Sequence, residues 1–199
     1  MTVAFQRSII LLSGPLAVGK TSVRDKLVLS GGFQPIRSST YLKTIADGAS
    51  GRRSLQEIGD RLDLETDYRW LLDRVATPAF EAEPERRLWL VDAVRKSRQV
   101  EHFRQSYESG TLIFHAHLDA PESILKQRFD NRQQGLGENV EGMSYETAID
   151  HDNERSARAL KAIADKVYDT STDLPEVIAA SILRDVQAGS GASLGGLGP

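Results

Sequence analysis

Short apolar runs alternate with amphipathic stretches along most of this chain. Runs of strand length, rich in isoleucine, leucine, valine and aromatic residues, lie at residues 8–14, 33–39, 86–94, 111–119 and 166–170. The run at 8–14 is almost continuously apolar, which is typical of a strand covered on both faces, as in a parallel sheet. The pattern therefore predicts five strands, with the first one buried.

Between these runs, apolar residues recur at the three- to four-residue spacing of a helix. Helices are predicted at residues 20–30, 40–46, from 54 onward, 67–76, 97–109, 120–133, 144–165 and 175–186. Ser54 and Glu57 form a capping-box pattern, and Pro78 is expected to end the helix before it. Because parallel neighbours need crossover connections, the alternation predicts an α/β fold with three α/β/α layers around a five-stranded parallel sheet.

The pattern also predicts how the chain divides. Residues 1–187 are expected to form one domain, with a small lid near 133–147 around a glycine-bearing stretch. Residues 188–199 are mostly glycine, serine, alanine and leucine. Such a segment has too little apolar surface to bury, so a disordered tail is predicted.

Composition and charge narrow the classes of partner. Hydrophobic residues make up 40% of the 199-residue chain, and no apolar run is long enough to cross a bilayer, so no membrane partner is expected. The absence of cysteine excludes disulfides, thiolate metal sites and cysteine nucleophiles, and it fits a cytoplasmic location. A net charge of -3 argues against binding to long nucleic acids. A monomer or homodimer is expected.

The segment "LSGPLAVGKTS" carries the most specific motif in the chain. It contains the pattern GxxxxGK[ST] between a predicted strand and a predicted helix, an arrangement in which loop N–H groups and a helix N-terminus surround phosphates. Lys20 would neutralise the outer phosphates, and the Thr21 hydroxyl would bind magnesium. ATP and Mg²⁺ are the predicted cofactors. The predicted nucleotide-binding residues are Gly14, Pro15, Leu16, Ala17, Val18, Gly19, Lys20, Thr21 and Ser22.

Other classes of nucleotide-binding protein find less support. The chain lacks the DxxG turn and the NKxD motif that a switch GTPase needs, and it is too short for a motor or transporter ATPase. The string "LSGGFQ" at 29–34 is similar to a transporter signature but follows Lys20 too closely. It is interpreted as the glycine C-cap of the first helix.

Four segments resemble the P-loop nucleoside monophosphate kinase-like family, the group of adenylate, dephospho-coenzyme A and deoxynucleoside monophosphate kinases. They are "ILLSGPLAVGKTS", "SSTYLKTIA", "LVDAVRKSRQVEHFR" and "HLDAPESILKQRFDNRQ". The third contains Asp92-x-x-Arg95 in place of the DGxPR of adenylate kinases, and the second has Lys43 where those kinases usually have arginine. The resemblance implies a nucleotide kinase whose acceptor-binding helix follows the second strand.

Asp92 and Arg95 are candidates on physical grounds as well. Asp92 stands at the carboxyl end of an apolar strand, where open α/β sheets place their sites, and its carboxylate could hold magnesium waters or act as a base. The alternative is a helix or turn cap. Arg95 is a candidate clamp for an acceptor phosphate, against the alternative of a surface ion pair.

Further cations complete the candidate set. Arg128 and Arg132 are i, i+4 neighbours on a predicted helix, so both are able to face one anion and are candidate catalytic residues that neutralise the migrating phosphoryl group. Lys43 and Arg53 flank the acceptor-side loop and are candidate substrate-binding residues.

Other polar residues are interpreted as structural. Arg155 and Arg158 are expected on a solvated helix face. His115 and His117 share one strand face, which permits joint metal binding, but no third ligand is evident nearby.

The leading hypothesis is a kinase that moves the ATP γ-phosphate to a nucleoside or deoxynucleoside monophosphate. Phosphoryl transfer depends chiefly on position and positive charge, and the motif regions offer many cations and one obvious carboxylate, Asp92. The alternatives are a kinase for a small hydroxyl substrate, of the dephospho-coenzyme A or modified nucleoside type, and an ATP-binding regulatory module without turnover.

Overall fold

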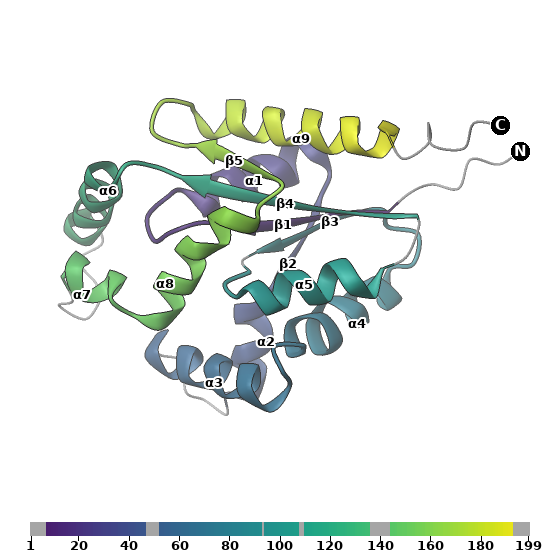
Figure 1. Ribbon diagram of the computed structural model, residues 1–199, viewed down its shortest axis with the longest axis horizontal. Helices are drawn as coiled ribbons and strands as arrows, with labels where there is room; N and C mark the ends of the chain where they lie inside the picture. Colours follow the sequence, from purple (N-terminus) through teal and green to yellow (C-terminus); the bar gives the residue numbers. More distant parts are fainter. Residues whose placement is uncertain (1–6, 47–51, 93, 108–109, 136–143, 193–199) are drawn as a thin grey trace, which may run out of the picture.

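The computed structural model describes residues 7–46, 52–92, 94–107, 110–135 and 144–192 (Figure 1). All five predicted strands are present and pair in parallel in the order β2-β3-β1-β4-β5, which confirms the predicted fold class. The strands are β1 (Arg7–Ser13), β2 (Gln34–Arg37), β3 (Leu88–Asp92), β4 (Thr111–Asp119) and β5 (Lys166–Asp169). β1 is the central strand, so both of its edges are hydrogen-bonded.

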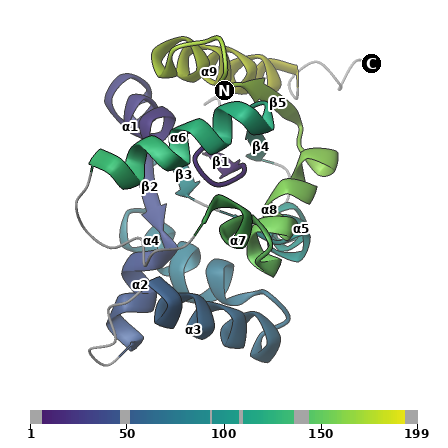
Figure 2. The ribbon, with the colours of Figure 1, turned by 90° about the vertical axis from the view of Figure 1, so that its left-hand side faces the viewer.

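Helices cover both faces of the sheet, and several other helices lie beyond the carboxyl ends of the strands (Figures 1 and 2). The helices are α1 (Lys20–Gly31), α2 (Ser38–Ile45), α3 (Arg52–Glu65), η1 (Leu71–Ala76), α4 (Thr77–Ala82), α5 (Ser97–Ser106), α6 (Glu122–Gly135), α7 (Tyr145–Ile149), α8 (Asp152–Ala159), η2 (Leu160–Ile163) and α9 (Pro175–Ala192). In both views α7 and α8 lie between α6 and α3. No helix in the described ranges has the length and apolarity needed to span a membrane.

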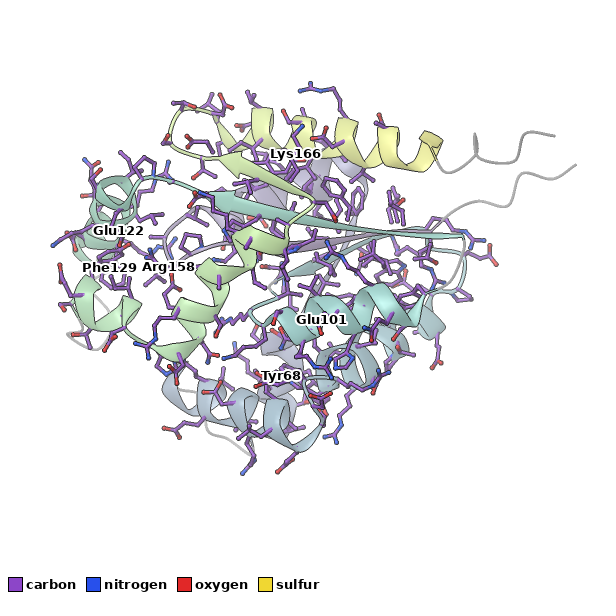
Figure 3. All side chains as sticks on the ribbon, viewed as in Figure 1. Tyr68, Glu101, Glu122, Phe129, Arg158 and Lys166 are labelled. Carbon is purple, nitrogen blue, oxygen red and sulfur yellow. The ribbon has the colours of Figure 1, made fainter. Side chains whose placement is uncertain are left out.

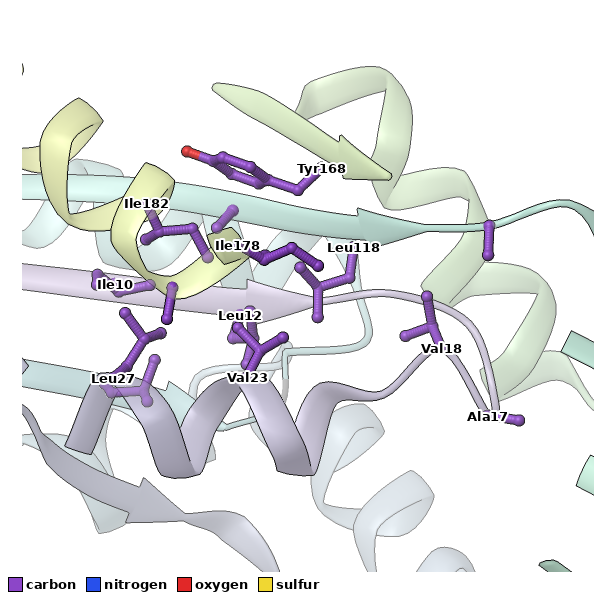
Figure 4. Packing of buried hydrophobic residues seen from close by; sticks show 14 of the residues in the cluster. Ile10, Leu12, Ala17, Val18, Val23, Leu27, Leu118, Tyr168, Ile178 and Ile182 are labelled. Carbon is purple, nitrogen blue, oxygen red and sulfur yellow. The ribbon is translucent and has the colours of Figure 1, made fainter. Parts of the chain in front are cut away.

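The alternation of side chains along β1 divides the core in two. Ile10 and Leu12 point into the layer that contains α1 and α9, where they meet residues such as Leu27 and Ile182 (Figure 4). Ile9 and Leu11 point to the opposite layer. Successive strand side chains face opposite sides of a sheet, so a continuous apolar run buries both faces at once. The β1 run therefore holds the two layers together.

The segment predicted as one helix over residues 144–165 is broken. Helix α7 ends at Ile149 and α8 begins at Asp152, and a 3₁₀ turn, η2, follows α8. The break lies at His151, whose backbone is extended with φ −69° and ψ 140°. The His151 ring Nδ1 accepts a hydrogen bond from the Asn153 N–H at 3.2 Å, so this residue starts a new helix instead of continuing the old one.

The helix expected to end before Pro78 instead continues to Ala82. The π-helical turn η1 precedes α4, and Pro78 falls in the first turn of α4. Proline has no N–H to donate, and the π-helical turn directly before it already interrupts the regular i to i−4 hydrogen bonds, so the ring is accommodated.

Other boundaries differ less. Helix α3 begins at Arg52, two residues before the start predicted at Ser54, and α9 extends over residues 188–192 of the predicted tail. Gly32 is the left-handed C-cap of α1, as expected from "LSGGFQ". Most of the expected lid, 136–143, and the rest of the tail, 193–199, lie outside the described residues.

The substitution Gly14→Ala should destabilise the fold by about 2 to 3 kcal/mol. Gly14 has φ 146°, and a Cβ there would lie 2.5 Å from the Leu118 carbonyl oxygen, which is backbone and cannot swing away. The control Gly189→Ala lies within α9, where a Cβ would meet Leu112 at an ordinary 3.6 Å. The free energy of unfolding of this control should rise by about 0.5 to 1 kcal/mol, because alanine favours a helix more than glycine does. Urea unfolding measures both, and equal midpoints for the two variants would contradict the reasoning.

Candidate active site

The predicted phosphate loop joins β1 to α1 at the central position of the sheet. Its backbone turns through positive φ angles at Gly14, Ala17 and Gly19, and Gly19 is the N-cap of α1. The Lys20 Nζ donates to the carbonyl oxygens of Gly14 and Pro15 at 2.6 and 2.7 Å, which places the ammonium group across the loop. Main-chain N–H groups, a helix N-terminus and an ammonium group are thus combined in one turn, the arrangement that binds phosphates.

Asp92 lies beside this loop. Its Cα is paired with that of Leu12 on β1, and its carboxylate accepts a hydrogen bond from Arg24 on α1 at 2.9 Å. Arg24 is three residues after Thr21, so the two side chains share one face of α1. Helix α5 has Lys96 as its N-cap, which means that Asp92 does not cap that helix. The strand register and the Arg24 contact place the Asp92 carboxylate beside α1, the helix that begins with Lys20 and Thr21.

A cavity of about 300 Å³ opens beyond the carboxyl ends of β2 and β3. It combines an apolar wall with carboxylate, amide, hydroxyl and guanidinium groups. Its lining residues are Ser38, Ser39, Leu42, Leu55, Gln56, Gly59, Asp60, Asp63, Trp70, Leu71, Arg95, Gln99 and Asn153. In a parallel sheet the carboxyl ends of all strands lie at the same end of the sheet. This cavity and the predicted phosphate loop are therefore both at that end.

Buried hydrogen bonds fix one wall of the cavity. The Asp63 carboxylate accepts from Trp70 Nε1 at 2.7 Å and from Gln99 Nε2 at 3.1 Å. Burial raises the pKa of the Asp63 carboxyl above its ordinary value. The Gln99 Oε1 in turn accepts from the backbone N–H groups of Arg95 and Lys96. This chain of contacts holds the backbone of Arg95 at the cavity.

Arg95 is the predicted acceptor residue that the structure brings to the cavity. Its guanidinium group is exposed and forms no ion pair or side-chain hydrogen bond with any other residue in the described ranges. Lys43, by contrast, is exposed on α2 and does not line the cavity. The side chain of Arg53 lies outside the described part of the chain.

Arg128 and Arg132 are not brought together on the loop. The Arg128 guanidinium donates to the Thr170 hydroxyl and carbonyl oxygens at 3.0 and 2.6 Å, while Arg132 is exposed one turn later. The Thr170 hydroxyl donates to the Val18 carbonyl at 2.9 Å. Arg128 therefore contacts the loop through Thr170, and its joint role with Arg132 stays a prediction.

The contact between α8 and the predicted phosphate loop was not predicted from the sequence. Glu154 accepts a hydrogen bond from the Leu16 N–H, inside the phosphate loop, at 2.7 Å. Arg158 binds Glu122 at 2.7 Å, Glu154 at 3.2 Å and the Tyr145 hydroxyl at 3.0 Å, and Figure 3 shows Arg158 close to Glu122. The expectation of a solvated face was therefore wrong for Arg158, although the i, i+4 spacing of Glu154 and Arg158 was a usable signal.

Arg155 does lie on an exposed face. It pairs with Asp150 and Asp152, whose side chains are also exposed. Exposed ion pairs of this kind contribute little to stability or to a site. The interpretation of Arg155 as a solvated residue is confirmed.

The two strand histidines hold the residue that precedes the loop. The Ser13 Oγ lies 2.7 Å from His115 Nε2 and 2.8 Å from His117 Nδ1, and all three side chains are buried. Burial lowers the pKa of both histidines to about 4, so both are neutral at pH 7. No group of three or more metal-binding side chains occurs within the described residues.

The sequence matches no protein-family model and no curated protein. Solved structures nevertheless resemble it along most of their length. A shikimate kinase from Aquifex aeolicus has a TM-score of 0.56 at 13% identity, with 92% of this chain and 98% of that chain covered. A sugar kinase from Janibacter sp. has a TM-score of 0.51 at 15% identity, with 90% and 93% covered. These likenesses show a shared fold.

Because His115 and His117 are neutral in the folded protein, its free energy of unfolding depends on pH. Between about pH 6.5 and 4 the unfolded chain takes up protons at His115 and His117 that the folded chain does not, so stability falls as the pH falls through this window. Each histidine should lower the free energy of unfolding by on the order of 1 to 2 kcal/mol at pH 5 relative to pH 7. Urea unfolding at both pH values measures this difference, which should be smaller in His117→Asn. An unchanged difference in that variant would refute the assignment.

Proposed function

We propose that this protein is an ATP-dependent kinase that transfers the γ-phosphate to a small acceptor bound in the cavity. The observation that carries the proposal is the position of the cavity. It lies beyond β2 and β3, and β3 is the direct neighbour of the strand that leads into the phosphate loop. A donor in the loop and an acceptor in the cavity would thus share one edge of the sheet.

The residues beside the loop fit a magnesium ion. Mg²⁺ prefers oxygen ligands, and the Thr21 hydroxyl and Asp92 carboxylate are the oxygen groups that would hold it or its waters. When bound, the ion would neutralise charge on the phosphate oxygens. Lys20 would bind the outer phosphates, and the loop N–H groups would orient the chain of phosphates.

Arg95 favours an anionic acceptor. Arg95 lines the cavity, its guanidinium group has no partner among the described residues, and guanidinium groups bind phosphate in bidentate fashion. An ionised phosphate is already a competent nucleophile near neutral pH and needs little base catalysis. We therefore propose a nucleoside or deoxynucleoside monophosphate as the acceptor, with the phosphate at Arg95 and the base against the apolar wall.

A small hydroxyl compound is the second candidate. Asp60 and Asp63 line the same cavity, and carboxylates bind hydroxyl groups as hydrogen-bond acceptors. A hydroxyl nucleophile also benefits from a carboxylate that takes its proton, a role open to Asp92. Two carboxylates beside one guanidinium make the cavity less suited to a doubly charged phosphate than a purely basic pocket would be.

An acceptor screen separates these candidates. Purified protein with Mg²⁺ and ATP should form ADP faster when nucleoside or deoxynucleoside monophosphates are added, and polyols or nucleosides should have little effect. Faster ADP formation with polyols or nucleosides than with monophosphates would identify a small hydroxyl compound as the acceptor. Tight ATP binding with no stimulation by any compound would instead favour a regulatory module.

Lys20→Ala should lower turnover about a hundredfold or more, because the ammonium group that neutralises the outer phosphates is lost. Its ammonium group donates to the loop carbonyls of Gly14 and Pro15 and its side chain is only half-buried, so the thermal midpoint should change little. A coupled assay for ADP gives the rate, and circular dichroism checks the fold. Wild-type turnover in a folded variant would contradict the kinase assignment.

Arg95→Gln should raise the KM for the acceptor about tenfold or more and leave the KM for ATP nearly unchanged. The matched control is Arg98→Gln, three residues later, where the guanidinium pairs with Asp67 and Glu101 and does not line the cavity. Steady-state kinetics with each substrate varied in turn gives both constants. Equal effects of the two substitutions would show that Arg95 does not bind the acceptor.

A further inference from the structure

Two consecutive residues of α8 contact the two halves of the candidate active site. Glu154 accepts a hydrogen bond from the Leu16 N–H of the phosphate loop, and Asn153 donates one from its Nδ2 to the Asp60 Oδ1, also at 2.7 Å. Both side chains are largely shielded, with Asn153 7% exposed and the Glu154 side chain 14% exposed. One short helix therefore touches both the donor loop and the acceptor cavity.

The Glu154 contact occupies a group that a nucleotide would use. Loop N–H groups bind the oxygens of a polyphosphate, yet here the Leu16 N–H is bonded to a carboxylate of the chain itself. A polyphosphate in the loop and the Glu154 carboxylate carry the same sign of charge in a poorly solvated space, so they repel one another. Nucleotide binding and the Glu154 contact therefore oppose each other.

The Asn153 contact has the corresponding effect on the cavity. Asp60 lines the cavity, and part of its acceptor capacity is used by the Asn153 amide. Further bonds tie α8 and its N-cap to the same side, namely Lys96 to Ser156 at 3.3 Å and Gln56 to His151 at 2.7 Å. Helix α8 has eight residues, and the break at His151 separates its start from α7.

We propose that Asn153 and Glu154 couple the two sites: nucleotide phosphates displace Glu154 from Leu16, α8 shifts, and Asn153 releases Asp60 to accept a hydrogen bond from a hydroxyl group of the acceptor. The coupling rests on the proposed function. Nucleotide binding then favours acceptor binding, with an expected gain in acceptor affinity of about 5- to 20-fold, and the acceptor strengthens nucleotide binding by the same factor. Glu154 and Asn153 are positioning residues in this scheme.

A distance measurement tests the shift without any acceptor or turnover. The chain has no cysteine, so spin labels can be attached specifically to Leu64→Cys on α3 and Ala159→Cys on α8, both at exposed positions. Adding a non-hydrolysable ATP analogue with Mg²⁺ should lengthen the distance between the labels. In a Glu154→Ala background the longer distance should already be present before the analogue is added. An unchanged distance in the otherwise unsubstituted labelled protein would overturn the proposal.

Nucleotide affinity provides the second test. Glu154→Gln should bind the same analogue about fivefold more tightly, because the opposing charge is removed. The control Glu122→Gln removes the other carboxylate that pairs with Arg158 but does not touch the loop, so its affinity should stay within about twofold of the unsubstituted protein. Equal tightening in both variants would assign the effect to Arg158 and reject the role of Glu154.

Asn153→Ala separates the coupling from nucleotide binding itself. It should leave the affinity for the analogue nearly unchanged, while the affinity for the best monophosphate of the acceptor screen should no longer depend on the analogue. Persistent dependence would overturn the proposed link. If no compound in the screen acts as acceptor but the labels still move, the kinase proposal fails and the response of α8 to nucleotide stands.

Discussion

The central position of β1 is the constraint on which the candidate active site depends. Because β1 is paired with β3 on one side and β4 on the other, the loop that follows it lies between the carboxyl ends of both neighbours. Asp92 reaches this loop from β3, and the buried His117 supports it from β4. A strand at the edge of the sheet would present only one such neighbour. The apolar run that buries β1 on both faces is therefore what makes the site possible.

The loop is held in place from several directions before any ligand is considered. Gly14 packs directly against the Leu118 carbonyl, Ser13 is held between two neutral histidines, and the Thr170 hydroxyl binds the Val18 carbonyl. These contacts come from β4 and from the segment after β5, which lie on the side of β1 opposite to the cavity. A loop fixed in this way is preorganised, which the proposed phosphoryl transfer would require.

The other side of the loop is built differently. There the contacts involve charged side chains: Arg24 pairs with Asp92, and Glu154 accepts from the Leu16 N–H. Charged contacts of this kind are exchanged at lower cost than apolar packing, because an incoming anion and water can replace them. The rigid contacts thus lie on the β4 side, and the exchangeable ones face the cavity and α8. This difference is consistent with a loop that stays fixed while its surroundings respond to ligand.

Sequence alone determined the parts of this protein that depend on local pattern. The strand at 111–119 has the predicted bounds, and the glycine-bearing turn between a strand and a helix was read from the spacing of its glycines. The end of β3 at Asp92 was predicted from the apolar run before it, and the role of Asp92 in a site stays a prediction. In each case a few neighbouring residues carry the whole signal.

Tertiary structure decided the rest. The contact of His151 with Gln56, the contact of Glu154 with the loop and the position of Asp60 and Asp63 in the cavity join segments that are far apart in the chain, such as Leu16 and Glu154. Helical periodicity shows which face of a helix is apolar, but not which partner its polar residues meet. That partner depends on how the helices settle on the sheet, and this packing is set by the whole core rather than by any local stretch of residues.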